Sequence, residues 1–353
     1  MADNEHPPQD DADKPGSGQE DLSPMVGQAD PAAPQDPDAA LDTEYSVEKQ
    51  IDLDEKSYSQ GQLVRRRFFR HKGAMIALGV LLGLIILAYS SIGFGNIPGW
   101  WGKSYLASSS VVDGGRPTLS VFPPSWGENP FGQETTGKDY FALTMRGTQQ
   151  SLIVAFAVGI GSTLIGTFVG AFAGFYRGWV EALLMRMTDV FIVIPLLILA
   201  AVVSKGLGGG IWGMSFTLSV LVWTGLARLV RGEVLSLRER EFVTAAEAIG
   251  TSSLRIIFKH ILPNTIGTII VSATLTIATA ILLETALSFL GYGINPPDSS
   301  LGQLISTYQT AFLSRPWLFW WPGMMILGIA LSVNFLGDGL RDAFDPRQNR
   351  NAD

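Results

Sequence analysis

An all-α integral membrane protein with six transmembrane helices and a disordered acidic N-terminal tail is the fold class that the sequence predicts. Hydrophobic residues make up 47% of the 353 residues, and the mean hydropathy is +0.25. After residue 60, apolar runs of about 20 residues, long enough to cross a bilayer, recur along the chain. Residues 1–60 carry 16 acidic and 3 basic side chains, whereas 61–353 carry 16 and 22, so the net charges are −13 and +6. The acidity therefore belongs to the tail and not to the membrane body.

The composition excludes several kinds of chemistry. The chain has no cysteine, which removes disulfides, thiol nucleophiles and thiolate metal ligands. Its histidines, His6, His71 and His260, are far apart in the sequence, so no metal centre is expected. A Gly-x-x-x-x-Gly-Lys-Ser/Thr loop is also missing, as is any Ser/His/Asp or paired-carboxylate arrangement outside the apolar runs and their turns. We therefore expect a chain that is not an enzyme, has no catalytic residues and holds no cofactor.

The first 60 residues are predicted to be a disordered cytoplasmic tail. They are rich in Asp, Glu, Pro, Gln and Ala and lack an aliphatic run, so they bury too little apolar surface to offset the entropy of ordering. The cationic start, apolar middle and cleavage site of a secretory signal are missing from them. An inert solvated extension is favoured over a regulatory or partner-binding tail.

A basic stretch precedes the first predicted crossing. The segment Arg65-Arg-Arg-Phe-Phe-Arg-His-Lys72 leads into an uncharged run from Gly73 to about Ile97, which can cross a bilayer at about 1.5 Å per residue. Positive charge beside a crossing marks the cytoplasmic side, so 61–97 is predicted to be a basic flank and the first transmembrane helix. Because orientation accounts for these arginines, no nucleic-acid partner is expected.

Residues 98–148 are polar and are predicted to form an external loop, with Trp100 and Trp101 at the membrane interface. The second crossing follows at about 151–175 and contains spaced glycines, namely Gly159, Gly161, Gly166, Gly170 and Gly174. Small residues let a neighbouring backbone approach closely, so this helix is predicted to lie inside a bundle. The general abundance of glycine in membrane helices explains part of the pattern.

The third and fourth crossings are predicted over about 187–204 and 211–230. Pro195 stands in the middle of the third and is expected to kink it, because proline lacks an N–H and its ring clashes with the preceding turn. We interpret Asp189 as a cap or dipole partner at the start of that helix and not as a catalytic acid. Basic residues return in the turn 176–186 and after the fourth crossing, so both regions and both termini are assigned to the cytoplasm.

The segment 231–264, between the fourth and fifth crossings, is predicted to be a cytoplasmic loop, and its polar part from Glu241 to Asn264 is predicted to form a helix, a turn and a second helix. Four residues fall on one stripe at helical spacing: Phe242, Ala245, Ala246 and Ile249. Gly250 interrupts this helix, 251–253 supplies an N-cap for a second short helix, and Pro263 with Asn264 is expected to end it.

The fifth crossing, about 266–290, contains Glu284, and the sixth, about 322–338, contains Asn334. A carboxylate at membrane depth is a functional candidate by default. We consider two roles for this pair of polar residues: contact with substrate on its path, or a polar contact within the bundle. The five crossings and their loops make up a predicted core over 149–340, and 341–353 is predicted to be a cytoplasmic C-terminal tail.

Several motifs resemble the permease subunits of binding-protein-dependent ABC importers, in particular the di- and oligopeptide branch. Five residues match the spacing of that family's Glu-Ala-Ala loop: Ala245, Ala246, Gly250, Leu262 and Pro263. Thr244 stands where the family has Glu, and His260 where it has Ile. Other segments agree, including Gly137-Lys-Asp-Tyr-Phe, Glu284-Thr-Ala-Leu-Ser-Phe-Leu-Gly and Gly337-Asp-Gly-Leu-Arg-Asp. Leu301 departs from the tryptophan that is usual before Gly302.

This resemblance implies a type I ABC importer permease-like fold and half of a translocation pathway for di- or oligopeptides. The residues it implies in coupling to an ATPase are Glu241, Ala245, Ala246, Gly250, His260, Leu262 and Pro263. The implied partners are a homologous second permease subunit, two ABC ATPase subunits that hold ATP and Mg, an extracytoplasmic peptide-binding protein and membrane lipid. The alternatives are import of nickel or another small solute by the same architecture and, more distantly, a secondary transporter or channel.

Overall fold

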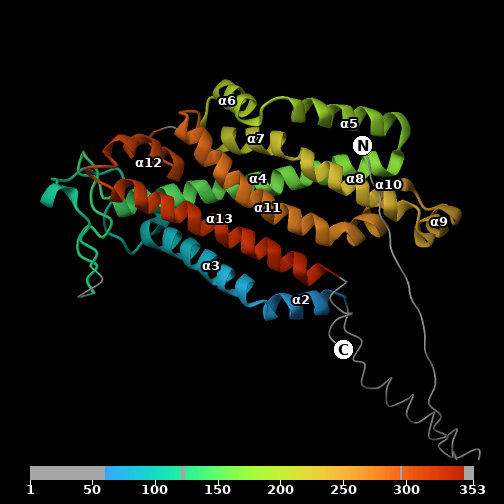
Figure 1. The fold of residues 1–353 in the computed structure, drawn as a ribbon, viewed down its shortest axis with the longest axis horizontal. Helices are drawn as coiled ribbons and strands as arrows, with labels where there is room; N and C mark the ends of the chain where they lie inside the picture. Colours follow the sequence, from blue (N-terminus) through green and yellow to red (C-terminus); the bar gives the residue numbers. More distant parts are fainter. Residues whose placement is uncertain (1–59, 121–123, 295, 346–353) are drawn as a thin grey trace, which may run out of the picture. The chain divides into compact units, whose positions relative to one another are not determined.

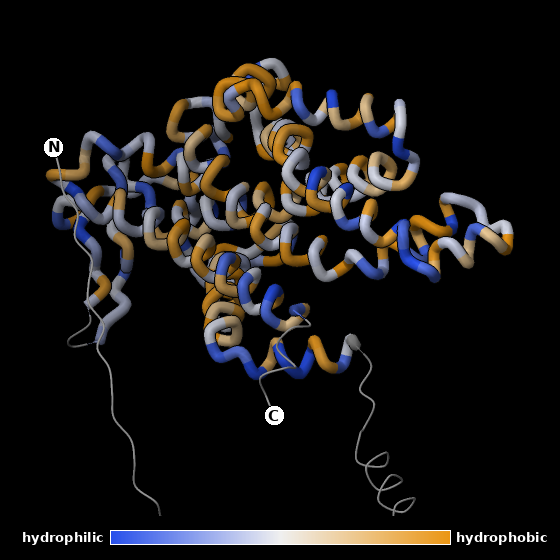
Figure 2. The backbone as a smooth tube through the Cα atoms, turned by 45° about the vertical axis from the view of Figure 1, so that its right-hand side comes forward, coloured by the Kyte–Doolittle hydropathy of each residue, from blue (hydrophilic) through white to orange (hydrophobic). Residues whose placement is uncertain are grey.

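The computed structural model describes residues 60–120, 124–294 and 296–345. The predictions for the acidic tail and for most of 341–353 lie outside these residues. Long helices run side by side through the described part, and short elements join them at their ends (Figure 1). Figure 2 shows apolar residues along the long helices and hydrophilic residues gathered toward their ends, which is the pattern of a bundle that spans a membrane.

The described residues contain four single helices that are long and apolar enough to cross a membrane: α3 (Lys72–Ile92), α4 (Tyr140–Tyr176), α11 (Leu262–Phe289, continuous with residues from Ser253) and α13 (Trp317–Phe344). Two bent pairs pass the same test, and they are α5 (Gly178–Val193) with α6 (Leu196–Gly206) and α7 (Gly210–Val222) with α8 (Thr224–Arg238). With each bent pair counted as one crossing, there are six, as the sequence predicts. The chain is an all-α, multi-pass membrane protein.

Short elements lie at the two ends of the long helices. They are α2 (Gln60–Arg70), β1 (Gly93–Phe94) paired antiparallel with β2 (Ile97–Pro98), η1 (Asp113–Gly115), α9 (Glu241–Ala248), α10 (Ser253–Ile256), η2 (Ile257–Ile261), α12 (Leu301–Tyr308) and η3 (Gln309–Ala311). The α9 end and the α12 end are opposite one another (Figure 1). The prediction that the first crossing runs to about Ile97 was too long, because the chain turns into this hairpin at Gly93.

Helix α4 begins about ten residues earlier than the apolar run predicts. Asp139 caps it, with a side-chain oxygen that accepts from the Ala142 amide at 2.8 Å. The extra turns mix apolar residues with polar ones that are also buried, and the threonine hydroxyls bond to their own helix, as Thr144 does to the Tyr140 carbonyl at 2.8 Å. Hydropathy does not detect such turns, because their polar groups are satisfied inside the bundle. The predicted external loop therefore ends near 139 and not at 148.

The glycines of α4 bring it into close contact with α8, and α4 also packs against α3, α7 and α11. A Cβ added at Gly166 would lie 2.8 Å from the Trp223 carbonyl oxygen, and one at Gly170 would lie 2.5 Å from that of Ala227. Gly174 continues the same face, and a Cβ added there would lie 2.8 Å from the Val234 Cβ. The predicted position of this helix inside the bundle is confirmed, and only glycine permits so close an approach.

Replacing Gly170 by leucine is expected to destabilise the α4–α8 contact. Overpacking of a close contact typically costs about 1–3 kcal/mol, and here the obstacle includes backbone that cannot rotate away. Thermal unfolding of the purified subunit should show a lower midpoint than for Gly232→Leu, since a Cβ at Gly232 on α8 meets nothing within 4 Å. Equal midpoints for the two variants would contradict this packing.

Pro195 breaks the third crossing into two helices, whereas the sequence predicted only a kink. Ile194 and Pro195 both take extended backbone conformations, and α5 and α6 meet at 94°. The residue before a proline avoids the α region, so the helix stops completely and starts again. The interpretation of Asp189 as a cap is wrong, because α5 begins at Gly178 and Asp189 lies toward its C-terminal end, paired with Arg228 at 2.6 Å.

Candidate functional site

Helix α9 has one buried face and one exposed apolar face. Val243 and Ala246 are buried in a cluster that includes Val234 of α8. Phe242 is 41% exposed and Ile249 is 83% exposed, and Ala245 is exposed between them. The predicted single stripe therefore divides, because Ala246 faces this chain's own core while the other three residues lie outside. An apolar ridge one helix long remains uncovered by the described residues.

Gly250 ends α9 with a left-handed turn. Its φ is +77°, a conformation that side chains other than glycine avoid. The Gly250 amide donates to the Glu247 carbonyl at 2.9 Å, and the Thr251 amide donates to the Ala246 carbonyl at 3.0 Å. These two bonds form a Schellman motif, which satisfies carbonyls that the end of a helix leaves free. Ser252 then takes the N-cap position of α10, as predicted, although its side chain makes no capping hydrogen bond.

The second helix of the segment does not end at Pro263, so that prediction is wrong. After α10 the chain makes one π-helical turn over Ile257–Ile261, and the Leu262 amide donates to the Ile257 carbonyl. Pro263 then sits in the first turn of α11, where the missing N–H and the fixed φ are tolerated. A wider turn next to a proline relieves its clash with the preceding carbonyls. The second helix is therefore continuous with the fifth crossing.

The remaining residues implied in coupling lie around this turn. The side-chain amide of Asn264 donates from Nδ2 to the His260 carbonyl at 2.6 Å, which gives that carbonyl a partner beside the proline. Leu262 packs partly against the cluster that holds Val243 and Ala246. Glu241 is exposed in the first turn of α9, where a negative charge is favourable. The structure thus brings all seven predicted residues to one end of the bundle, with Ala246 and Leu262 facing inward.

Ion pairs tie the bent helices together near this end. The Arg231 Nε donates to Glu181 at 2.7 Å, joining α8 to α5, and Arg177 pairs with Glu239 at 2.5 Å. A cavity of about 480 Å³ between α5 and α8 includes both Arg231 and Arg228 in its lining. The cations and carboxylates of this cavity are already paired with one another. Among the described residues, no cluster of three or more His, Cys, Asp or Glu side chains could hold a metal ion.

Glu284 is completely buried. One carboxyl oxygen accepts from the Ser151 hydroxyl of α4 at 2.9 Å, and the other accepts from Ser288 at 2.7 Å. The Ser300 hydroxyl donates to the Ser288 hydroxyl at 3.1 Å, and the Leu301 backbone amide donates to the Ser151 hydroxyl at 3.2 Å. This network joins α4, α11 and the start of α12. Of the two roles considered for Glu284, the geometry favours the contact within the bundle.

Asn334, the other polar candidate, is half-buried on α13. Its side chain makes no hydrogen bond with any residue in the described ranges. Its position does not distinguish substrate contact from a bundle contact, so its role stays a prediction.

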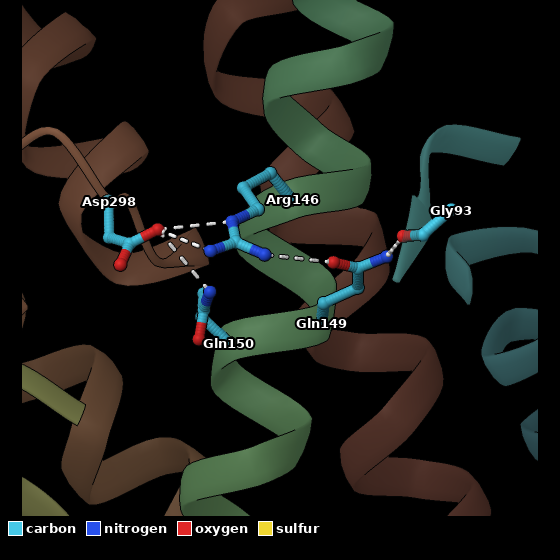
Figure 3. A network of polar contacts seen from close by, with 5 residues as sticks. All are labelled: Gly93, Arg146, Gln149, Gln150 and Asp298. Carbon is cyan, nitrogen blue, oxygen red and sulfur yellow. Dashed lines mark hydrogen bonds and ion pairs between the residues drawn. The ribbon is translucent and has the colours of Figure 1, made fainter. Parts of the chain in front are cut away.

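A polar network at the α12 end was not predicted as a site (Figure 3). The Arg146 guanidinium of α4 donates to one oxygen of Asp298 from Nε at 3.1 Å and from Nη2 at 2.6 Å. Gln149 accepts from the same guanidinium and donates to the Gly93 carbonyl at 2.8 Å. Arg146 also lies 5.3 Å from the centre of the Tyr105 ring. Arg146 therefore joins α4 to the segments that hold Asp298 and Tyr105, and the neighbouring Gln149 joins α4 to β1. The sequence contains one signal for this network, which is the charge of Arg146 within a polar stretch that the structure shows to be helical.

Comparison with known proteins gives the family. A family model described as the binding-protein-dependent transport system inner membrane component matches residues 166–350. A second model, described as the N-terminal TM domain of oligopeptide transport permease C, matches residues 59–93. Together these matches include α2, α3, the last third of α4 and the chain from there to residue 350.

Individual relatives agree with the family models. The oligopeptide transport system permease protein OppC of Mycobacterium tuberculosis is 38% identical over 290 residues, which cover 82% of this chain and 95% of that protein. OppC of Haemophilus influenzae is 35% identical over 305 residues, covering 85% and 94%. Among solved structures, a chain of the inward-facing MetNI methionine ABC transporter aligns with a TM-score of 0.48 and 21% identity, over 57% of this chain and 96% of that one.

The family match covers more than half of the chain, and it includes α9, the π turn and the crossings on both sides of them. The OppC relatives extend the similarity to most of the remainder. The chain therefore belongs to the family of binding-protein-dependent transport system inner membrane components.

Proposed function

We propose that this chain is a permease subunit of an ABC importer for di- or oligopeptides and that α9 couples it to a separate ATPase subunit. The observation that carries the proposal is the exposed apolar ridge of Phe242, Ala245 and Ile249, on a helix whose other face is anchored in the bundle. An apolar helix face fits a hydrophobic groove on a partner. The ATPase subunits supply ATP hydrolysis and Mg, and this chain supplies none.

The path of the motion follows from the chain between α9 and α11. Force on the ridge passes to the bundle through Val243 and Ala246, which are buried against α8 and its neighbours. It also passes through the turn at Gly250 into a helix that runs without a break from Ser253 to Phe289. That helix packs against α4 and α13. A rigid displacement of α9 therefore tilts a complete crossing instead of being lost in a flexible loop.

The orientation and the remaining partners are part of the same proposal. The α9 end and both termini face the cytoplasm, because the basic residues gather there. The α12 end faces an extracytoplasmic peptide-binding protein. The bent pair α5–α6 exposes large apolar side chains, such as Val193, Ile198 and Val202, and we assign this face to lipid and to a homologous second permease subunit that completes the pore.

The peptide substrate rests on the names of the OppC relatives and on their coverage of this chain. Nickel or another small solute in the same architecture is the second candidate. Uptake by vesicles containing both permeases and both ATPases, supplied with the binding protein, separates these cases. A labelled oligopeptide should accumulate only with ATP, and unlabelled peptide should compete whereas nickel should not. Uptake by this chain alone without ATP would instead support a secondary transporter.

Contact between α9 and the ATPase can be tested by cross-linking, because the natural chain has no cysteine. In Ile249→Cys, a benzophenone–maleimide attached to the single thiol should cross-link to the ATPase, with a yield that changes on addition of ATP. The matched control is Leu313→Cys, because Leu313 is 94% exposed but lies beside α12 at the other end. Equal yields from the two positions would exclude the proposed contact.

A further inference from the structure

An apolar groove runs along α3 and α13 on the outside of the bundle. It has a volume of about 330 Å³ and is lined on α3 by residues between Gly73 and Val80, and on α13 by residues between Gly328 and Phe335. On both helices the lining positions follow the spacing i, i+3, i+4 and i+7, so the groove follows one face of each. Apart from Ser332, every lining residue is glycine or apolar. None of the described elements covers it.

The dimensions of the groove fit a lipid chain. Seven residue steps along α3 span about 10 Å, and one leaflet of the hydrocarbon core is about 15 Å deep. The groove therefore accommodates most of one acyl chain within a single leaflet. It begins at the first turn of α3, where the apolar run starts, so its mouth lies at the level of the lipid head groups.

The mouth of the groove carries charges of both signs. Arg70 and Lys72 are exposed just before Gly73, and neither is paired with a carboxylate of the described residues. On α13 the face of Phe335 continues, at i+3 and i+7, to the exposed Asp338 and Asp342. Asp342 lies at the start of α3, because its carboxylate is 3.4 Å from the His71 Nε2.

The mouth is also held in a fixed arrangement. The His71 Nδ1 accepts from the Ala74 amide at 3.0 Å and so caps α3, which leaves Nε2 to carry the hydrogen toward Asp342. The Arg67 guanidinium of α2 donates to the Asp345 carbonyl at the end of α13 at 3.0 Å. Cations from the α2–α3 junction and carboxylates from α13 are therefore held at the same end of the groove, the cations on the α3 side and the carboxylates on the α13 side.

We propose that this groove is a binding site for phosphatidylethanolamine. One acyl chain lies between α3 and α13, the phosphate lies at Arg70 and Lys72, and the primary ammonium donates hydrogen bonds to Asp338 and Asp342. A lipid with only an anionic head group leaves these carboxylates facing a like charge. The quaternary ammonium of phosphatidylcholine has no N–H to donate. The head group that complements both sides is one with a phosphate and a primary amine.

Native mass spectrometry of the delipidated full-length subunit tests the head-group preference. Phosphatidylethanolamine, phosphatidylglycerol and phosphatidylcholine with identical acyl chains are added separately. We expect phosphatidylethanolamine to bind about tenfold more tightly than the other two, which corresponds to about 1.4 kcal/mol. The double variant Asp338→Asn/Asp342→Asn should lose this preference, whereas Glu247→Gln, which changes an exposed carboxylate on α9, should keep it.

A second pair of variants tests the groove itself. Ile76 and Ile86 are both on α3 and are 69% and 63% exposed, but only Ile76 lines the groove. Ile76→Trp should reduce retention of phosphatidylethanolamine, and Ile86→Trp should not, with circular dichroism confirming that both are folded. Tighter binding of phosphatidylglycerol, equal binding of all three lipids, or no effect of Ile76→Trp would each overturn the proposal.

Discussion

Replacing Glu284 by leucine is expected to produce the largest loss of stability of any single substitution considered for this chain. The carboxylate accepts the hydroxyls of Ser151 and Ser288, and all of these groups are buried. Leucine has a similar volume but cannot accept a hydrogen bond, so the hydroxyls of Ser151 and Ser288 both lose their acceptor. Each lost bond costs about 0.6–3 kcal/mol, depending on how well the stranded group finds another partner. The unfolding midpoint of the purified subunit, measured by differential scanning fluorimetry, should fall clearly.

Glu284→Gln is the matched variant, because its amide oxygen can still accept one of the two hydroxyls. It should recover at least part of the lost stability. ATP-dependent uptake by the assembled transporter should then follow stability across both variants, since the geometry makes Glu284 a link between α4, α11 and α12. A glutamine variant with normal stability but no uptake would instead indicate that Glu284 contacts substrate on its path.

The crossings could be predicted from the sequence because each depends on a local property, the length of an apolar run. The same property fails at the start of α4, where Thr144 and Thr148 are polar but buried and hydrogen bonded. The length of an apolar run also fails to predict the structure at Pro263, because the π turn that accommodates the proline depends on backbone hydrogen bonds that no residue pattern indicates. The Asp139 cap was the one local signal for the earlier start of α4.

The sequence identifies the segment that forms the candidate site, but it does not identify which residues of that segment are exposed. Helical spacing groups Ala245 with Ala246, yet only the packing of α8 and the π turn decides that Ala246 is buried and Ala245 is exposed. An arginine at 246 would therefore disrupt the anchoring of α9, whereas an arginine at 245 would alter only the exposed ridge. The Arg146 network likewise depends on contacts between positions that are 152 residues apart.

Gly250 is expected to be the residue whose substitution most reduces ATP-dependent uptake without preventing membrane insertion. Its φ of +77° is costly for other residues, by about 1–2 kcal/mol, and most of all for a β-branched one. In Gly250→Pro, φ is fixed near −65° and the amide hydrogen bond to Glu247 is lost as well. A free-energy cost of this size lowers the population of molecules with α9 in its native position by a factor of about 5–30. We therefore expect uptake by reconstituted vesicles to fall about tenfold in Gly250→Val and further in Gly250→Pro.

Two features separate a coupling defect from simple misfolding. A Cβ at Gly250 meets nothing within 4 Å, so the strain is confined to the turn and the bundle should unfold at a nearly unchanged midpoint. Gly250→Asn is the conservative control, because asparagine tolerates the left-handed region and should retain most of the uptake. The ATPase subunits should still hydrolyse ATP beside the valine variant, but hydrolysis should no longer respond to the loaded binding protein. Normal stimulated uptake in Gly250→Val would mean that α9 moves independently of its turn, and the continuous helix from Ser253 to Phe289 could not then be the route of the force.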